Sequence, residues 1–462
     1  MTAPDSGWAS AFPSGWRTVR FGMVFRESTD RNGDEPVGEA LSVSEYRGVT
    51  PRDTDEGQMA SEDVSMYRIV RPGQLAANVM WLNRSGLGVS RHLGYVSPAY
   101  KVFDIDVSLE RRYADYLLRS TLYRAIFESL GRGVRPNAQM VDTFELKAIP
   151  IPLPDRDEQV RIADFLDRET AKIDALIDKQ LGLVRLLEQR RQSVITSATS
   201  GEGHPRVSTG SVWYPLVPQA WRLTRVRDAA SVVTDGAHIS PDTVGGVHDF
   251  VSTRDISNGG IDLEGSLKTS ADTYEYMVRT GCRPEAGDVL FSKDGTVGET
   301  AIVPPGSRFV VASSLVIIRP KPQTITAQYL RFALLSKTAQ EHAASYMRGA
   351  GLPRLSVANL ARVELAVPPL AEQRQIVDSL VRSTTRISAL MAKAEEFVTL
   401  ARERRAALIT AAVTGQLDVR AARQDALGDD LVAPLTDDET SWLDGNCESC
   451  GDLGTAADRP VT

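Results

Sequence analysis

The chain contains two copies of one long segment at a fixed separation in the sequence. Residues 158–201 align without a gap with residues 372–415, an offset of 214 residues, and about 19 of the 44 aligned positions are identical. Self-similarity at one fixed offset constrains the fold more than any other feature, because it decides how many copies of a structural unit the chain holds. The sequence therefore predicts a duplication in which each copy of a large unit ends with this segment.

Both segments have the pattern of a long helix. Their apolar residues recur at alternating steps of four and three, which is the seam of a coiled coil, and Gly201 and Gly415 stand where helices commonly end. A single apolar stripe would most simply be buried in an ordinary core. Two matched stripes favour two helices, residues 155–201 and 369–417, that pack antiparallel around a pseudo-twofold axis. The residues expected to pair the helices are Ile162, Leu166, Ile173, Leu176, Leu183, Leu187, Ile376, Leu380, Ile387, Leu390, Phe397 and Leu408.

Each expected helix follows a region in which short β-branched runs alternate with Gly, Asp and Asn turns. These regions, residues 1–154 and 220–368, are predicted to be mixed α/β domains, and each closes with one helix, over Arg111–Leu130 and over Ala327–Tyr346. Residues 202–219 are rich in Gly, Ser and Pro and are predicted to be a linker. The expected fold is therefore α+β, with two mixed domains joined by two long helices that form an antiparallel coiled coil.

The charge of the chain is concentrated at one end. The net charge is −7, and residues 421–462 alone hold ten acidic residues against Arg423 and Arg459. The rest of the chain is close to neutral, so the overall acidity does not exclude a nucleic acid ligand, although any basic surface must be local. Residues 418–462 are predicted to be an acidic, disordered tail.

Composition also bears on where the protein works. The first sixteen residues have no basic start and no apolar run, and no stretch approaches 18 consecutive apolar residues, so we expect neither a signal peptide nor a membrane span. The only cysteines are Cys282, Cys447 and Cys450, which favours a reducing cytoplasm. Cys447 and Cys450 form one C-x-x-C, for which a zinc half-site stays open but incidental cysteines are favoured.

No catalytic constellation is visible in the sequence. It has no G-x-x-x-x-G-K-[S/T] phosphate loop and no G-x-G-x-x-G after an expected strand. The five histidines lack the spacing of metal ligands. We therefore expect no catalytic residue, no metal site and no cofactor held by this chain.

The expected loops carry polar residues suited to reading DNA. Arg and Lys can bond guanine edges or phosphates, and Asn can pair with adenine in the major groove. Taken singly, each such residue is more often an ordinary surface residue, and this alternative stays open. The candidate DNA-binding residues are Asn78, Asn83, Arg84, Arg91, Arg132, Arg135, Arg254, Lys293, Thr296, Arg348 and Arg354.

The openings of the two long helices share a further pattern. Residues 149–154 read IPIPLP before Glu158 and Gln159, and residues 367–371 read VPPLA before Glu372 and Gln373. Both segments then end with Arg-Arg, Ile-Thr and Gly, and the second mixed region contains GDVLFSKDG. With these motifs the chain resembles, over about residues 15–420, the specificity (S) subunit of type I restriction–modification systems.

The resemblance implies a function. Each mixed region would be a target recognition domain that reads one half of a bipartite, asymmetric double-stranded DNA site. The paired helices would set the spacer between the half-sites and dock two methylation subunits, and through these the restriction subunits. Members of the family carry no catalytic site, and S-adenosylmethionine, ATP and Mg²⁺ belong to the partner subunits.

Two other functions stay open at this point. One is a methyltransferase or nuclease with fused recognition domains, which needs cofactor loops that the sequence lacks. The other is a coiled-coil DNA-binding scaffold without sequence preference, which leaves the duplicated mixed regions unexplained.

Overall fold

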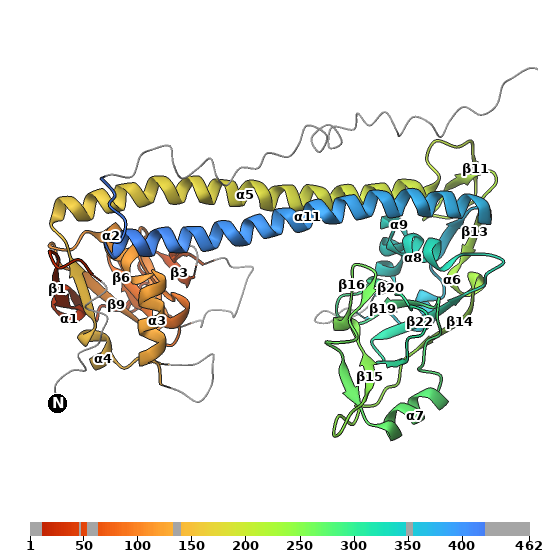
Figure 1. The fold of residues 1–462 in the computed structure, drawn as a ribbon, viewed down its shortest axis with the longest axis horizontal. Helices are drawn as coiled ribbons and strands as arrows, with labels where there is room; N and C mark the ends of the chain where they lie inside the picture. Colours follow the sequence, from red (N-terminus) through yellow and green to blue (C-terminus); the bar gives the residue numbers. More distant parts are fainter. Residues whose placement is uncertain (1–11, 46–47, 53–62, 133–139, 348–353, 421–462) are drawn as a thin grey trace, which may run out of the picture. The chain divides into compact units, whose positions relative to one another are not determined.

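The chain folds into two compact units. The computed structural model describes residues 12–45, 48–52, 63–132, 140–347 and 354–420 (Figure 1). Unit 1 comprises Met1–Lys179 and Phe397–Thr462, and unit 2 comprises Gln180–Glu396. Each unit therefore holds one mixed region together with parts of both long helices, which are α5 (Arg156–Ser200) and α11 (Leu370–Val413).

Unit 1 is built on two four-stranded sheets. One has the strand order β2-β9-β6-β7 and is antiparallel throughout. The other has the order β4-β3-β8-β5 and contains one parallel pair, β3 with β8. A separate antiparallel ribbon, β1 with β10, ends just before α5 begins. The strands are β1 (Arg17–Arg20), β2 (Phe25–Ser28), β3 (Glu39–Ser44), β4 (Gly48–Pro51), β5 (Arg68–Val70), β6 (Leu75–Asn78), β7 (Leu87–Val89), β8 (Gly94–Val96), β9 (Tyr100–Ile105) and β10 (Pro150–Leu153).

Three helices of unit 1 begin at residues whose side chains accept a backbone N–H. Glu110, Ser120 and Asp142 each do so, which satisfies donors that a helix start leaves free. The predicted single helix over Arg111–Leu130 was wrong, because Ser120 is extended and caps a second helix. The helices of unit 1 are α1 (Phe21–Val24), α2 (Arg111–Leu118), α3 (Thr121–Leu130), α4 (Thr143–Ala148) and the 3-10 turn η2 (Leu82–Arg84).

The core of unit 1 joins the mixed region to both long helices. The aromatic side chains of Phe21, Phe103 and Tyr113 are fully buried in it. Ile162 of α5 and Val413 of α11 belong to the same cluster. Because each such side chain contributes about 1.5–3 kcal/mol on burial, the mixed region depends on both helices for its stability.

Unit 2 repeats this plan with additions. Its main sheet has the order β14-β22-β19-β20, and a second sheet has the order β18-β15-β21 with a parallel pair, β15 with β21. The predicted helix over Ala327–Tyr346 is again two helices, because Ser336 caps the second one. The elements are β11 (Arg206–Ser208), β12 (Leu216–Pro218), β13 (Arg222–Arg225), α6 (Val226–Ala229), β14 (Ala230–Asp235), β15 (His248–Val251), η3 (Thr253–Asp255), β16 (Ile256–Ser257), β17 (Gly260–Ile261), β18 (Leu267–Thr269), α7 (Ala271–Arg279), β19 (Val289–Ser292), β20 (Thr300–Ile302), β21 (Phe309–Val311), β22 (Leu315–Pro320), α8 (Ala327–Leu335), α9 (Lys337–Ser345), α10 (Val357–Leu360) and β23 (Glu364–Val367).

The order of elements shows that the duplication includes the mixed regions. The sheet β2-β9-β6-β7 corresponds strand by strand to β14-β22-β19-β20. The ribbon β1–β10 corresponds to β13–β23, and the helix pair α2–α3 to α8–α9. The parallel pair β3–β8 likewise corresponds to β15–β21. Equivalent positions in the two units can therefore be compared residue by residue.

The two long helices pack together within each unit and run antiparallel (Figure 1). In unit 1, the first turns of α5 share a core with the last turns of α11, and Asp174 lies 2.9 Å from Nε of Arg405. In unit 2, Ile195 near the end of α5 shares a core with Leu380 near the start of α11. Among the described residues, none of the helices combines the length and the apolar character that a membrane span requires.

The buried stripe of the long helices differs slightly from the expected one. Several expected positions are only partly buried, and at Leu176, Ile376, Phe397 and Leu408 the following residue is the buried one: Ile177, Val377, Val398 and Ile409. An α-helix has 3.6 residues per turn, so positions chosen by a strict seven-residue repeat gradually leave its buried face. At these four places the buried residue is therefore the next one in the sequence. The expected pairing residues that are fully buried are Ile162, Leu166, Ile173, Leu187, Leu380, Ile387 and Leu390.

The segment expected to be a linker, residues 202–219, has a defined structure. Its strands β11 and β12 form an antiparallel hairpin. Tyr214, Val217 and Trp221 are buried in a cluster with Ala366 of β23. The segment is therefore attached to unit 2. Residues 421–462 of the expected tail, with Cys447 and Cys450, lie outside the described residues.

Candidate nucleic-acid interface

In unit 1, two loops that carry predicted DNA-binding residues lie side by side. Asn78 is the last residue of β6, Asn83 and Arg84 belong to the connection between β6 and β7, and Arg132 follows α3. The chain returns from the second loop at Val141, whose N–H donates to the carbonyl oxygen of Val79 at 3.1 Å. This hydrogen bond ties the two loops together. We call residues 78–86 with residues 132 and 140–142 the unit 1 loop pair.

Unit 2 has the same arrangement at the equivalent place. Lys293 and Thr296 lie on the connection between β19 and β20, and Arg354 follows α9. The N–H of Leu355 donates to the carbonyl oxygen of Lys293 at 3.0 Å, as Val141 does to Val79 at an offset of 214 residues. We call residues 292–299 with residues 354–356 the unit 2 loop pair. The candidates Arg135 and Arg348 lie outside the described residues.

The unit 1 loop pair exposes both polar and apolar side chains. Arg84 is exposed, and the side chains of Met80 and Trp81 are 40% and 51% exposed. Oδ1 of Asn78 accepts the N–H of Met80 at 3.2 Å, which fixes the turn. Asn83 is partly buried, and its carbonyl oxygen accepts from Arg124 at 3.4 Å. An exposed cation beside an exposed aromatic ring suits contact with phosphates and bases.

The unit 2 loop pair is organised by charge. Lys293 is buried, and its Nζ lies 3.2 Å from Asp294 and 3.5 Å from Asp235. Its charge is therefore balanced within the protein, and it holds the loop in place. Arg354 is anchored differently: its Nε lies 3.3 Å from Asp294, yet its side chain is 75% exposed. The outward cation of this loop pair is thus Arg354, beside the exposed Thr296.

Two predicted residues lie apart from the loop pairs, and a third is engaged. Arg91 follows β7, so it sits at the other end of the β6–β7 hairpin from Arg84. Arg254 is exposed in η3, between β15 and β16. Arg132 is exposed but forms an ion pair with Glu145 of α4. Among the described residues, no group of three or more His, Cys, Asp and Glu side chains could hold a metal ion.

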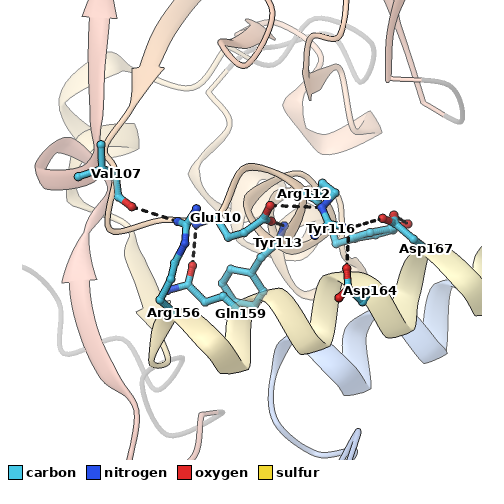
Figure 2. A network of polar contacts seen from close by, with 9 residues as sticks. All are labelled: Val107, Glu110, Arg112, Tyr113, Tyr116, Arg156, Gln159, Asp164 and Asp167. Atoms are coloured by element: carbon cyan, nitrogen blue, oxygen red, sulfur yellow. Dashed lines mark hydrogen bonds and ion pairs between the residues drawn. The ribbon is translucent and has the colours of Figure 1, made fainter.

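A buried glutamine attaches each mixed region to the long helix that follows it. Oε1 of Gln159 accepts the N–H of Glu110 at 2.7 Å (Figure 2). Its Nε2 donates to the carbonyl oxygens of Ser108 and Pro154. Gln373 makes the same three bonds, to the N–H of Thr326 at 2.8 Å and to two carbonyl oxygens. The identity of these two residues in the repeat was visible in the sequence, but two of the three partners of each glutamine lie some fifty positions away.

A threonine attaches each mixed region to the other long helix. Oγ1 of Thr410 on α11 accepts the N–H of Thr121 at the start of α3, at 3.2 Å. Oγ1 of Thr196 on α5 accepts the N–H of Lys337 at the start of α9, at 2.9 Å. These threonines are also identical in the repeat. Each mixed region is therefore bonded to both helices through equivalent residues.

Unit 1 adds a polar network of its own between α2 and α5. Arg112 lies 2.8 Å from both Asp164 and Asp167, and the hydroxyl of Tyr116 donates to Asp167 at 2.8 Å (Figure 2). The hydrogen bond from Arg112 to Asp167 leads the contacts that raise the pKa of its guanidinium. Burial raises the pKa of Tyr116 to about 12, so this hydroxyl stays protonated and donates at neutral pH.

These features define a class of protein. Two equivalent α+β units, each with a polar loop pair and each bonded to the same two long helices, make an internally duplicated protein. The repetition of both the loops and the attachments indicates that the two units perform the same kind of task.

Comparison with known proteins shows which proteins the chain resembles. Residues 240–397 match the family model of the type I restriction modification DNA specificity domain. The type I restriction enzyme EcoBI specificity subunit of Escherichia coli is 23% identical over 237 residues, which cover 49% of this chain and 50% of that subunit. The EcoDI specificity subunit of the same organism is 20% identical over 389 residues, covering 80% of this chain and 81% of that subunit.

The fold agrees with these matches. A chain from a solved structure, described as the basis of complex assembly and conformational transition of the type I R-M system, has a TM-score of 0.58. That chain is 17% identical, and the match covers 88% of this chain and 99% of the other. The chain is therefore similar in sequence and in fold to type I restriction–modification specificity subunits.

Proposed function

We propose that this chain is the DNA-recognition subunit of a type I restriction–modification complex, in which each unit reads one half of a bipartite, asymmetric site. The observation that carries the proposal is the equivalence of the two loop pairs, each closed by the same backbone hydrogen bond. Phosphate contacts supply affinity that depends on salt, and contacts to base edges supply sequence preference. Two separate units can hold different side chains at equivalent places, as Val79 and Lys293 show.

The relatives are named specificity subunits, and this chain is accordingly a non-catalytic subunit. We assign the S-adenosylmethionine, ATP and Mg²⁺ of the complex to its partner subunits. The whole complex then works in the cytoplasm, where the DNA is.

The long helices serve as spacer and docking surface in this proposal. They form a coiled coil that sets the number of unspecified base pairs between the half-sites and binds two methylation subunits, which in turn bind the restriction subunits. Leu186 and Leu400 support the docking role: they are identical in the repeat, yet 63% and 52% exposed. Two equal apolar positions on the surface suit two copies of one partner.

The recognition role is tested by changing one loop pair at a time. The site is first mapped from methylated adenines in cells that contain the chain and its partner subunits. Arg84→Ala should then weaken binding or relax sequence preference at one half-site, by about 1–3 kcal/mol per lost base contact, and Arg354→Ala at the other half-site. Exposed arginines outside the loop pairs, changed as Arg26→Ala and Arg308→Ala, serve as matched controls.

The outcomes separate this function from its alternatives. If both variants relax the sequence preference at the same half-site, the assignment of one half-site to each unit is wrong. A chain that binds all duplexes equally would be a scaffold without sequence preference. Methyl transfer to DNA by the purified chain alone would show a fused enzyme.

The spacer role has a separate test. Four residues inserted at Gly182 of α5 lengthen that helix by about one turn, or roughly 6 Å. The mapped site should then contain one or two more or fewer base pairs between its halves. An unchanged spacer would contradict the role of the helices as a ruler.

A further inference from the structure

Unit 1 contains a cavity that the loop pairs do not use. Its volume is about 790 Å³, which lies in the range of small-ligand sites. It lies between the start of β4, the connection that follows β7, helix α2 and the two long helices. Its charged lining residues are Arg91, Arg111, Arg112, Asp115, Arg119, Asp167, Asp174 and Arg405, and His92 lies beside Arg91.

The acidic residues of the cavity are already engaged. Asp167 pairs with Arg112 at 2.8 Å. Asp115 pairs with Arg119 at 3.3 Å, and Asp174 with Arg405 at 2.9 Å. Arg112 also pairs with Glu110 at 3.2 Å and with Asp164 at 2.8 Å, so three of the five arginines are engaged by carboxylates.

The other two arginines of the lining have no such partner among the described residues. Within the described part of the chain, the guanidinium groups of Arg91 and Arg111 and the ring of His92 have no hydrogen bond or ion pair. In addition, Nε of Arg119 is buried without a hydrogen-bond partner. The cavity thus combines two guanidinium groups without partners with an unused N–H donor of Arg119, which is chemistry suited to binding an anion.

The backbone holds one of these arginines in position. The guanidinium of Arg111 lies against Gly73, where a Cβ atom would come within 2.5 Å of Nη1. Gly73 has a φ of 87°, which an L side chain rarely adopts. The equivalent Gly287 of unit 2 has no atom within 4 Å of such a Cβ, and the position equivalent to Arg111 is Ala327. The arrangement is therefore special to unit 1.

We propose that this cavity binds a phosphate group through Arg91, Arg111 and His92. The planar guanidinium offers paired N–H donors that match two phosphate oxygens. Gly73 and Arg91 lie at the end of the β6–β7 hairpin away from the unit 1 loop pair, roughly 10 Å along the strands. The phosphate site is thus distinct from the surface proposed to read bases.

Two sources can supply this phosphate. One is the backbone of bound DNA, and this source rests on the proposed function. The other is a free phosphate compound such as a nucleotide, and this source is independent of the proposed function. Both share the same chemistry at the cavity, so the experiment has two arms.

The first arm measures the binding of a free phosphate compound, by titration calorimetry of the full chain with inorganic tripolyphosphate. If the phosphate comes from a free compound, the chain binds tripolyphosphate. Arg91→Ala and Arg111→Ala should then each weaken that binding at least tenfold. Arg111→Lys keeps the charge but not the paired donors, so its affinity for tripolyphosphate should lie between those of the unchanged chain and Arg111→Ala. Arg26→Ala, an exposed arginine on β2 of the same unit, should bind like the unchanged chain.

The second arm measures DNA affinity against salt concentration. If the source is the DNA backbone, Arg111→Ala lowers the slope of log affinity against log salt by about 0.9 for the lost contact, and Arg26→Ala does not. A chain that fails to bind DNA would overturn the proposed function but leaves the first arm to decide the cavity. The phosphate site is overturned if tripolyphosphate does not bind and the slope stays unchanged, or if the Arg26→Ala control matches the cavity variants.

Discussion

The two units attach the same fold to the same helices by different chemistry. In unit 1, Arg112 and Tyr116 of α2 reach Asp164 and Asp167 on α5 through ion pairs and a hydrogen bond. In unit 2, the position equivalent to Tyr116 is Phe332, which is buried in the apolar core. The buried glutamines, by contrast, make the same bonds in both units. The difference indicates that the glutamine contact is required, whereas the rest of the contact can be either polar or apolar.

The largest contrast is expected between Phe332→Ala and Arg112→Ala. Removal of the buried ring should destabilise unit 2 by about 3–5 kcal/mol, because a cavity remains in a packed core. Loss of the partly exposed ion pairs of Arg112 should cost unit 1 only about 1 kcal/mol, and less at high salt. Hydrogen exchange measured unit by unit checks both values. Equal losses would show that the two contacts do not differ in kind.

The glutamines should behave alike. Gln159→Met and Gln373→Met each leave a buried N–H and buried carbonyl oxygens without a partner, which should cost about 3 kcal/mol in the unit concerned. Denaturant unfolding followed by hydrogen exchange gives the loss for each unit. A loss in one unit only would mean that the repeated bonds are not equivalent in energy.

The units should also differ in their response to acid. His342 of α9 is buried, its Nδ1 accepts the N–H of Glu364 at 3.3 Å, and its ring stacks on Trp213. Burial lowers the pKa of His342 below its usual value of 6.5. The unfolded chain therefore takes up a proton first, so the stability from this residue is present above about pH 6.5 and is lost as pH falls below that value.

The equivalent position in unit 1 is Ile126, which does not titrate. Unit 2 should therefore lose more stability than unit 1 between pH 7 and pH 5. In His342→Gln, that extra loss should disappear. Unfolding curves at several pH values, resolved by hydrogen exchange, check this, and an unchanged pH profile in the variant would rule out His342 as the cause.

The smallest effect is expected at the threonines that reach the opposite helix. Thr410→Val and Thr196→Val each remove one acceptor and keep the side-chain volume, so each should cost about 1 kcal/mol. Protection of the amide of Thr121 should fall in the first variant and that of Lys337 in the second. If the two amides exchange as before, these bonds do not hold the mixed regions to the helices.

The sequence predicted the long helices well, because their gapless identity and their apolar spacing are both local signals. The break between α2 and α3 was missed, because Ser120 interrupts neither the apolar pattern nor the polar one. The roles of Gln159 and Gln373 were missed for another reason: a residue's identity in a repeat shows that it matters, but not which distant backbone group it binds.

The candidate site was predicted in part. The loop residues of each unit were named, and a hydrogen bond between segments far apart in sequence brings them together. Arg84 and Arg91 were both candidates, although the β6–β7 hairpin places them at opposite ends. The burial of Lys293 also had no sequence signal, because its partner Asp235 lies on another strand.

The division of the chain has a consequence for its synthesis. Unit 2 is one continuous stretch of the chain, whereas unit 1 contains residues from both ends. Thr121 bonds to Thr410, which lies 289 positions later in the sequence. At about 5–20 residues per second, a ribosome needs roughly 15–60 s to deliver that partner. During this interval the apolar residues at the start of α5 lack the cover that α11 gives them, so the nascent chain should bind chaperones through its first half and release them only as translation ends.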